Sequence, residues 1–213
     1  MAATGGTFTA WLNYLDVAVN VDGDYDPSQS RTALGTGTLD LRAMRGVALN
    51  VVTARVGQCG TGNVYLPSGS VTAAVLRVGT SGGASVLDLR DTRFAVGTLF
   101  TNGPLGTVRT HVSGASCGLD VTNGAAGSFG ISTGGVYNLV FEQTPPIDQD
   151  CWGLRLAGDW QALLTAYTSD GRITWDLSAV TPARRAAFGV YYRNGFTWVG
   201  LSHAPNGVIV QLR

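Results

Sequence analysis

The sequence contains no lysine and only one glutamate, Glu142. All fourteen of its basic side chains are therefore arginine, and its acidic side chains are otherwise aspartate. Lys and Glu are the long, helix-compatible residues that usually cover the solvent face of a helix. A chain that nearly lacks both has little with which to cover helices, so the composition predicts an all-β protein.

Charge of either sign is also scarce, because only 13% of the residues are charged and the formal net charge is zero. The long-range positive field that attracts phosphate backbones is missing, so we expect no nucleic-acid partner. The first twenty residues have no positive segment followed by an apolar run, which predicts no signal peptide and synthesis in a cytoplasm. No segment is long and apolar enough to predict insertion into a membrane.

Cysteine is limited to Cys59, Cys117 and Cys151, which are far apart and lack CxxC spacing. An odd, widely spaced set indicates neither a disulfide framework nor a zinc site. We expect buried free thiols.

Glycine, in contrast, is abundant, with thirty residues. Turn dipeptides such as Gly82-Gly83 and Asn102-Gly103 recur roughly every eight to twelve residues between β-rich runs, as in sandwiches and barrels. This pattern predicts an antiparallel β-sandwich, jelly-roll-like, with at most one or two short helices. One such helix is predicted where Thr181 can cap the run Ala183–Ala187 and Pro182 can take its first position.

The paired prolines of segment 143–150 (QTPPIDQD) cannot lie in a central strand. We therefore divide the chain into a β-sandwich region, 1–144, and a C-terminal antiparallel hairpin region, 145–213, which is either separate or part of the same sandwich. The tetrapeptide LDLR occurs at 39–42 and again at 87–90. No fixed period continues this match, so it does not predict an internal duplication.

Two hairpins are predicted in the C-terminal region. A two-residue Asn194-Gly195 turn would place Tyr191 opposite Trp198. Alternation then puts four aliphatic or aromatic residues toward the core: Phe188, Val190, Val199 and Leu201. A second hairpin, around Asp170-Gly171, would turn another set toward the core: Leu164, Ala166, Trp175 and Leu177.

The opposite face of the first hairpin is the main candidate site. It carries Tyr191, Arg193, Phe196 and Trp198, and Trp160 is a further aromatic candidate. Aromatic and arginine side chains on a flat sheet can fill a protein interface or stack on sugar rings. Three interpretations remain open: core beneath a second sheet, a subunit interface, or a ligand platform.

A metal site is the second candidate. Asp22, Asp24 and Asp26 alternate along a loop and could converge on calcium. Pro27 and Ala33 occupy positions where an EF-hand needs glycine and an acidic residue, so only a looser calcium loop is possible. The alternative is a solvated acidic turn.

No catalytic residues are predicted. The pattern GxSxG occurs around Ser81 and Ser116, but neither is followed by the helix that a nucleophile elbow requires. A triad of Ser116 with Asp159 or Asp176 and then His203 has no alternating strand and helix scaffold to support it. A glycan hydrolase with an unrecognised aspartate pair remains an alternative.

The overall character of the chain resembles structural proteins of bacteriophage particles, especially tail, baseplate and head-decoration proteins. The features that carry the resemblance are the absence of lysine and of an export signal, the low charge, the abundant Gly and Thr, and the dense β-turns. The resemblance implies a non-enzymatic virion protein, made in the host cytoplasm, that forms a homo-oligomer, often a trimer, and contacts other virion proteins. The alternative is a carbohydrate-binding module that recognises a host-surface glycan through Tyr191, Trp198 and Trp160. Neither function implies a cofactor.

Overall fold

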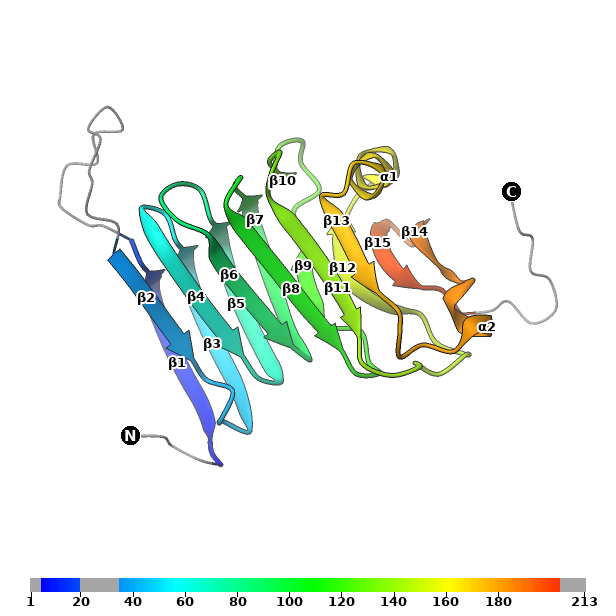
Figure 1. Cartoon of the computed structure of the whole chain (residues 1–213), viewed down its shortest axis with the longest axis horizontal. Coiled ribbons are helices and arrows are strands. Elements are labelled where there is room, and N and C mark those ends of the chain that lie inside the picture. The colour runs from blue at the N-terminus through cyan, green and yellow to red at the C-terminus, as the bar shows by residue number, and fades with distance from the viewer. Residues whose placement is uncertain (1–4, 20–34, 204–213) are drawn as a thin grey trace.

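The computed structural model describes residues 5–19 and 35–203. In it the chain forms a parallel β-solenoid of about four turns, with two sheets facing each other across one hydrophobic core (Figure 1). Each coil contributes a strand to each sheet, and successive coils stack from the N-terminal to the C-terminal end. The prediction of an all-β chain is confirmed, but the prediction of an antiparallel, jelly-roll-like sandwich is wrong.

Sheet A has nine strands, in the order β1-β3-β5-β7-β9-β12-β15-β14, and the short strand β10 pairs with β7 outside this path. The pairs from β1 to β12 are parallel, and β15 joins them through antiparallel pairing with β12 and β14. The strands are β1 (Thr7–Val17), β3 (Gly46–Val56), β5 (Gly69–Val78), β7 (Thr92–Asn102), β9 (Gly118–Val121), β10 (Phe129–Ile131), β12 (Cys151–Ala157), β14 (Phe188–Arg193) and β15 (Phe196–Leu201).

Sheet B has six parallel strands, in the order β2-β4-β6-β8-β11-β13. Because β12 lies beside β9 and β13 lies beside β11, the strands after segment 143–150 continue the same two sheets. The strands are β2 (Gly35–Asp40), β4 (Gly60–Leu66), β6 (Ser85–Arg90), β8 (Gly106–Val112), β11 (Val136–Phe141) and β13 (Ile173–Asp176).

Two helices lie toward the C-terminal end of the solenoid (Figure 1). Helix α1 (Gln161–Ser169) connects β12 to β13, and helix α2 (Pro182–Arg185) lies between β13 and β14. Pro182 begins α2 and Thr181 precedes it, as predicted, although the Thr181 side chain makes no capping hydrogen bond. Neither helix of the described residues is long and apolar enough to cross a membrane.

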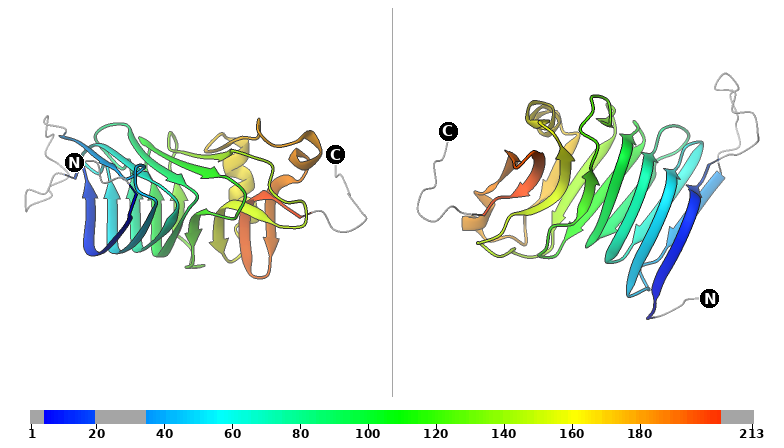
Figure 2. Two further views of the ribbon diagram at one scale, coloured as in Figure 1. Left: turned by 90° about the horizontal axis from the view of Figure 1, so that it is seen from below. Right: turned by 180° about the vertical axis from the view of Figure 1, so that it is seen from behind.

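The prediction of antiparallel strands was wrong because side chains alternate between the two faces of a sheet in the same way in parallel and antiparallel strands. What differs is the connection, since a parallel neighbour must be reached by a crossover. Here the crossover from one strand of a sheet to the next is the intervening strand of the other sheet. The turn after β3, residues 57–59, thus carries the chain from sheet A to sheet B and closes no hairpin (Figure 2).

A glycine corner repeats at the end of successive sheet A strands. The Gly57 N–H donates to the Val17 carbonyl and the Gly79 N–H donates to the Val56 carbonyl, both at 2.8 Å, so the hydrogen-bond ladder continues through the bend. Gly79 has a φ of +56°, and a Cβ there would lie 2.1 Å from the Gly106 backbone nitrogen. Only glycine fits this stacked corner.

The core consists of rows of apolar residues that stack from coil to coil. In sheet A one row is nearly solvent-free over five strands, so each coil covers its neighbour. It contains Leu49, Val71, Phe94, Leu119 and Leu154, in paired register. Stability in such a fold comes mainly from contacts between adjacent coils.

The two LDLR segments occupy equivalent positions two coils apart. Leu39 and Leu87 both pair with Val64, and Asp40 and Asp88 both pair with Tyr65. The match in sequence therefore marks a structural repeat, although the coil between them carries different residues. The varying corner lengths prevent a fixed period from appearing in the sequence.

The predicted hairpin around Asp170-Gly171 is wrong, because residues before the turn form α1 and β13 pairs in parallel with β11. In α1, Leu164 and Tyr167 are buried on one face, three residues apart, while Trp175 of β13 remains 44% exposed.

Candidate functional site

The β14–β15 hairpin forms with the predicted register. Tyr191 pairs with Trp198 and Arg193 pairs with Phe196 across the Asn194-Gly195 turn. Val199 and Leu201 lie fully buried in the core. Residues of opposite parity, including Tyr191 and Trp198, therefore lie on the outer face of sheet A.

Trp198 is not displayed on that face, because only 5% of it is exposed. The Tyr191 ring packs on it with ring centroids 4.6 Å apart. Trp160 packs elsewhere: it lies against the core beside Phe129, and its indole N–H donates to the Ala157 carbonyl at 2.7 Å. The predicted trio of Tyr191, Trp198 and Trp160 does not form one exposed platform.

Arg155, which the sequence did not single out, organises the surface around Phe196. Its guanidinium carbon lies 4.7 Å from the ring centres of both Trp152 and Phe196. The same guanidinium donates to both carboxylate oxygens of Asp120, at 2.9 and 2.7 Å. Stacking and the paired hydrogen bonds hold this arginine in one orientation.

Asp120 is fully buried beneath its arginine partners. Arg93 on β7 also donates to it, with Nε 3.0 Å from Oδ2. Burial alone would raise the Asp120 pKa, but the hydrogen bonds from Arg155 and Arg93 outweigh burial and lower it. The carboxylate therefore links β7, β9 and β12 as a charged group.

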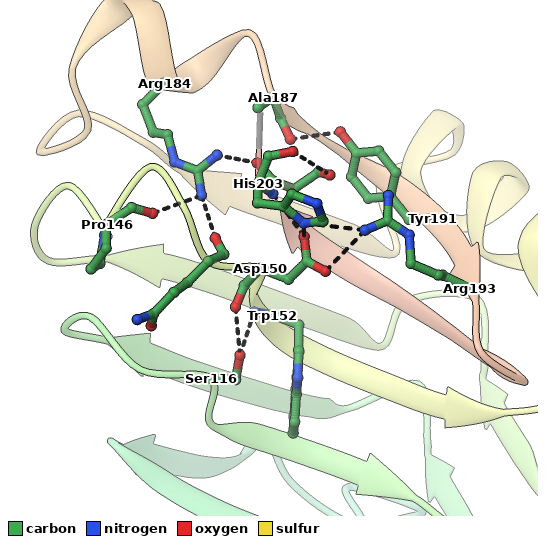
Figure 3. A network of polar contacts seen from close by, with 11 residues as sticks. Ser116, Pro146, Asp150, Trp152, Arg184, Ala187, Tyr191, Arg193 and His203 are labelled. Carbon is green, nitrogen blue, oxygen red and sulfur yellow. Dashed lines mark hydrogen bonds and ion pairs between the residues drawn. The ribbon is translucent and has the colours of Figure 1, made fainter. Parts of the chain in front are cut away.

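A polar network joins the end of β14 to the segment before β12 (Figure 3). Asp150 accepts hydrogen bonds from the backbone N–H and from Nδ1 of His203, both at 2.7 Å. Arg193, a predicted site residue, donates to the other Asp150 oxygen at 3.3 Å. Burial works to raise the Asp150 pKa, but the bonds from His203 and the charge of Arg193 produce a net lowering.

Arg184 of α2 is buried beside this network (Figure 3). Its guanidinium donates to the carbonyls of Pro146 and Gln149, at 3.1 and 2.7 Å, and to that of Ser202. One arginine thus ties segment 143–150 to the chain that follows β15. Arg184 therefore has a structural role at the C-terminal end of the solenoid.

The serine motifs take part in backbone contacts. Ser116 Oγ donates to the Asp150 carbonyl and accepts from the Trp152 N–H, both at 3.2 Å (Figure 3), and Ser81 Oγ donates to the Gln58 carbonyl. The Asp159 and Asp176 carboxylates accept from nearby backbone N–H groups. Within residues 5–19 and 35–203, no hydrogen bond joins Ser116 to a histidine.

His111 lies between two carboxylates on the outer face of sheet B. Its Nε2 lies 3.4 Å from Asp88 and its Nδ1 lies 2.9 Å from Glu142. Arg109 and Arg90 contact the same two carboxylates, at 3.5 and 3.3 Å. The hydrogen bond to Asp88, followed by that to Glu142, raises the His111 pKa against the opposing effect of burial.

The predicted calcium loop lies outside the described residues, since Asp22, Asp24 and Asp26 all fall within 20–34. In the part of the chain that the structure describes, no three His, Cys, Asp or Glu side chains are grouped to hold a metal. Cys117 and Cys151 are buried free thiols, as expected, whereas Cys59 is half-buried. Burial raises the pKa of Cys151 to about 12.

At the N-terminal end of the solenoid, the core-facing side chains are more exposed to solvent than those of the next coil. Phe8 is 38% exposed, whereas Val47, its partner on β3, is 2% exposed. Leu12 is likewise half-buried beside the buried Val51. We call this surface the open end; it comprises the outer edges of β1 and β2 and the partly exposed side chains Phe8, Ala10, Leu12, Leu15, Leu39 and Leu41.

β1 also carries the most exposed aromatic side chains of the described residues. Trp11 is 77% exposed and Tyr14 is 62% exposed, both on the outer face of sheet A. These two residues are not among the predicted site residues, because a β-rich run does not by itself show which strand lies at the edge of a sheet. The signal available was TFTAWLNYLDV, a strand with large apolar side chains on both faces.

Comparisons of the chain with protein-family models, with curated protein sequences and with solved structures gave no match.

Proposed function

We propose that the protein is a non-enzymatic structural protein of a bacteriophage particle, on the tail, baseplate or capsid, and that it acts through protein contacts at its open end. The phage setting is supported by the composition described above. The single observation that supports action by contact is the contrast between Phe8 and Val47, which occupy equivalent positions in adjacent coils but differ about 20-fold in exposure. Core residues that remain accessible at one end of a regular stack are typical of an interaction surface.

The experiment has two readouts. Size-exclusion chromatography with light scattering measures the mass of the isolated protein, and surface plasmon resonance measures binding to purified capsid and tail proteins. We expect self-association, binding to at least one particle protein, or both. A protein that remains monomeric at high concentration and binds neither class of particle protein contradicts the proposal.

Recognition of a host-surface glycan is the second candidate, and the exposure of Trp11 favours it. An aromatic ring displayed on a flat sheet can stack on a sugar ring. The neighbouring Tyr14 lies beside Arg55, whose guanidinium is 5.4 Å from the Tyr14 ring centre and is paired with Asp16. Planar polar groups of this kind can donate to and accept from sugar hydroxyls.

A glycan array tests this second function. Binding that is lost in Trp11→Ala but kept in Trp175→Ala, an exposed tryptophan on the other sheet, would support it. Absence of glycan binding by the wild type, or equal binding by both variants, would contradict it.

A further inference from the structure

The outer edge of β1 is the longest unpaired strand edge in the described part of the chain. β1 has eleven residues and pairs on one side only, with β3. Within residues 5–19 and 35–203, no strand pairs with the backbone N–H and C=O groups on the other side, which can accept a further strand. Proteins usually protect such edges with lysine, proline or inward-pointing charge. β1 has none of these, and its one charged residue, Asp16, is bonded to Arg55.

The C-terminal end is covered in ways that the open end is not. The antiparallel β14–β15 hairpin follows the last parallel strands, and α1 packs beside it. Gln161 of α1 donates to the Val190 carbonyl of β14 at 3.3 Å. The two ends therefore differ in structure: the last strand of sheet A at the C-terminal end, β14, has six residues and contacts α1, whereas β1 has eleven.

We propose that the open end binds the open end of a second copy of this chain, related by a two-fold axis, with β1 antiparallel to β1 of the partner. An unpaired edge has one row of backbone groups and accepts one strand, so pairing at this edge gives a dimer rather than the trimer that the resemblance to phage proteins implies. A two-fold contact uses the same surface on both copies, so β1 of one copy pairs with β1 of the other. The inference rests on the proposed function and specifies its first partner.

The size of the open end is consistent with a stable interface. Eleven residues of strand span about 36 Å, and two sheets about 10 Å apart with their outer side chains give a width of roughly 20 Å. The contact would cover about 700 Å² on each copy, close to the ~800 Å² of a standard protein interface. Phe8, Leu12 and Leu15 would then gain the burial that their β3 partners already have.

Hydrogen–deuterium exchange at several protein concentrations, combined with light scattering, tests the inference on the wild type. We expect a mass of twice 22.2 kDa at high concentration and slow exchange of the outward β1 amides, which are those that do not bond to β3. On dilution the mass should halve, and the outward β1 amides should exchange faster, while the amides of β5 stay protected.

A matched pair of variants tests the surface. In Leu12→Lys the two introduced ammonium groups would face each other across the axis, so we expect the dimer dissociation constant to rise about 100-fold. Val52→Lys, on the exposed outer face of the adjacent strand β3, should dimerise as the wild type does. Circular dichroism and unchanged β5 exchange would show that both variants are folded.

Each alternative result overturns the inference. A monomer with unprotected outward β1 amides at all concentrations, a trimer, or a dimer unaffected by Leu12→Lys would each do so. A monomer whose outward β1 amides are protected at every dilution would show that the chain covers its own edge. The proposed function survives each of these results if the protein still self-associates or binds a particle protein, and fails only if it is monomeric and binds none.

Discussion

The Arg155 guanidinium donates to both carboxylate oxygens of Asp120, at 2.9 Å and 2.7 Å, and it lies between two aromatic rings. Asp120 is fully buried, while Arg155 and Arg93 are partly exposed. A carboxylate in such a position is stable only with its partners, because an unpaired buried charge is costly.

We therefore expect Asp120→Asn to lower the free energy of unfolding by about 2–4 kcal/mol, since it removes the negative charge that two arginines share and replaces one acceptor oxygen with an NH2 donor. Asp40→Asn is the matched control, because Asp40 also pairs with an arginine, Arg42, but at an exposed position. The control should change stability much less. Urea denaturation measures both, and equal losses would contradict the structural role assigned to Asp120.

The His111 cluster predicts a pH dependence of stability. Its pKa in the folded protein is raised above the ordinary 6.5, mainly by Asp88 and then by Glu142, while Arg90 and Arg109 contact the same carboxylates. A raised histidine pKa stabilises the folded state fully below pH 6.5, and this contribution disappears as the pH rises through the folded-state pKa.

His111→Gln should therefore reduce stability by about 1 kcal/mol near pH 5.5 and by less near pH 8.5. Thermal unfolding of the wild type and the variant at both pH values measures the difference. An equal loss at the two pH values would show that the imidazolium does not contribute.

The stacked corner predicts that Gly79→Ala destabilises the protein by at least about 2 kcal/mol. Its positive φ and the 2.1 Å approach to the Gly106 backbone leave no room for a Cβ. Gly130→Ala, in β10, is the control, because a Cβ there meets nothing within 4 Å. Chemical denaturation of both variants should separate them, and a tolerated Gly79→Ala would argue against this corner geometry.

The two tryptophans at opposite ends of sheet A should differ in their effect on stability. Trp198→Ala is expected to cost about 3–5 kcal/mol because it removes a buried ring beneath Tyr191. Trp11→Ala, which removes a ring that is 77% exposed, should leave the monomer's unfolding nearly unchanged. A large loss in the Trp11 variant at concentrations where the protein is monomeric would contradict the exposure described here.

Turns and helix starts could be predicted because residues adjacent in the sequence determine them. The Asn194-Gly195 turn specifies its hairpin register because both strands adjoin it, and Pro182 marks the start of α2 for the same reason. Helix α1 was missed because its buried pair, Leu164 and Tyr167, was interpreted as part of an alternating strand. Arg155 and Asp120 are 35 residues apart, and no local pattern connects them.

The amino-acid sequence determined that the chain would be nearly all β, that its thiols would be largely buried, and that the hairpin at 188–201 would have an aliphatic and an aromatic face. Alternation and turn residues act over a few positions, so these properties are local. Only the tertiary structure decided that the strands stack in parallel as coils, that Trp198 is covered while Trp11 is exposed, and that one end of the core remains accessible. Those outcomes depend on which strands become neighbours, and that choice follows from the packing of complete coils rather than from any segment alone.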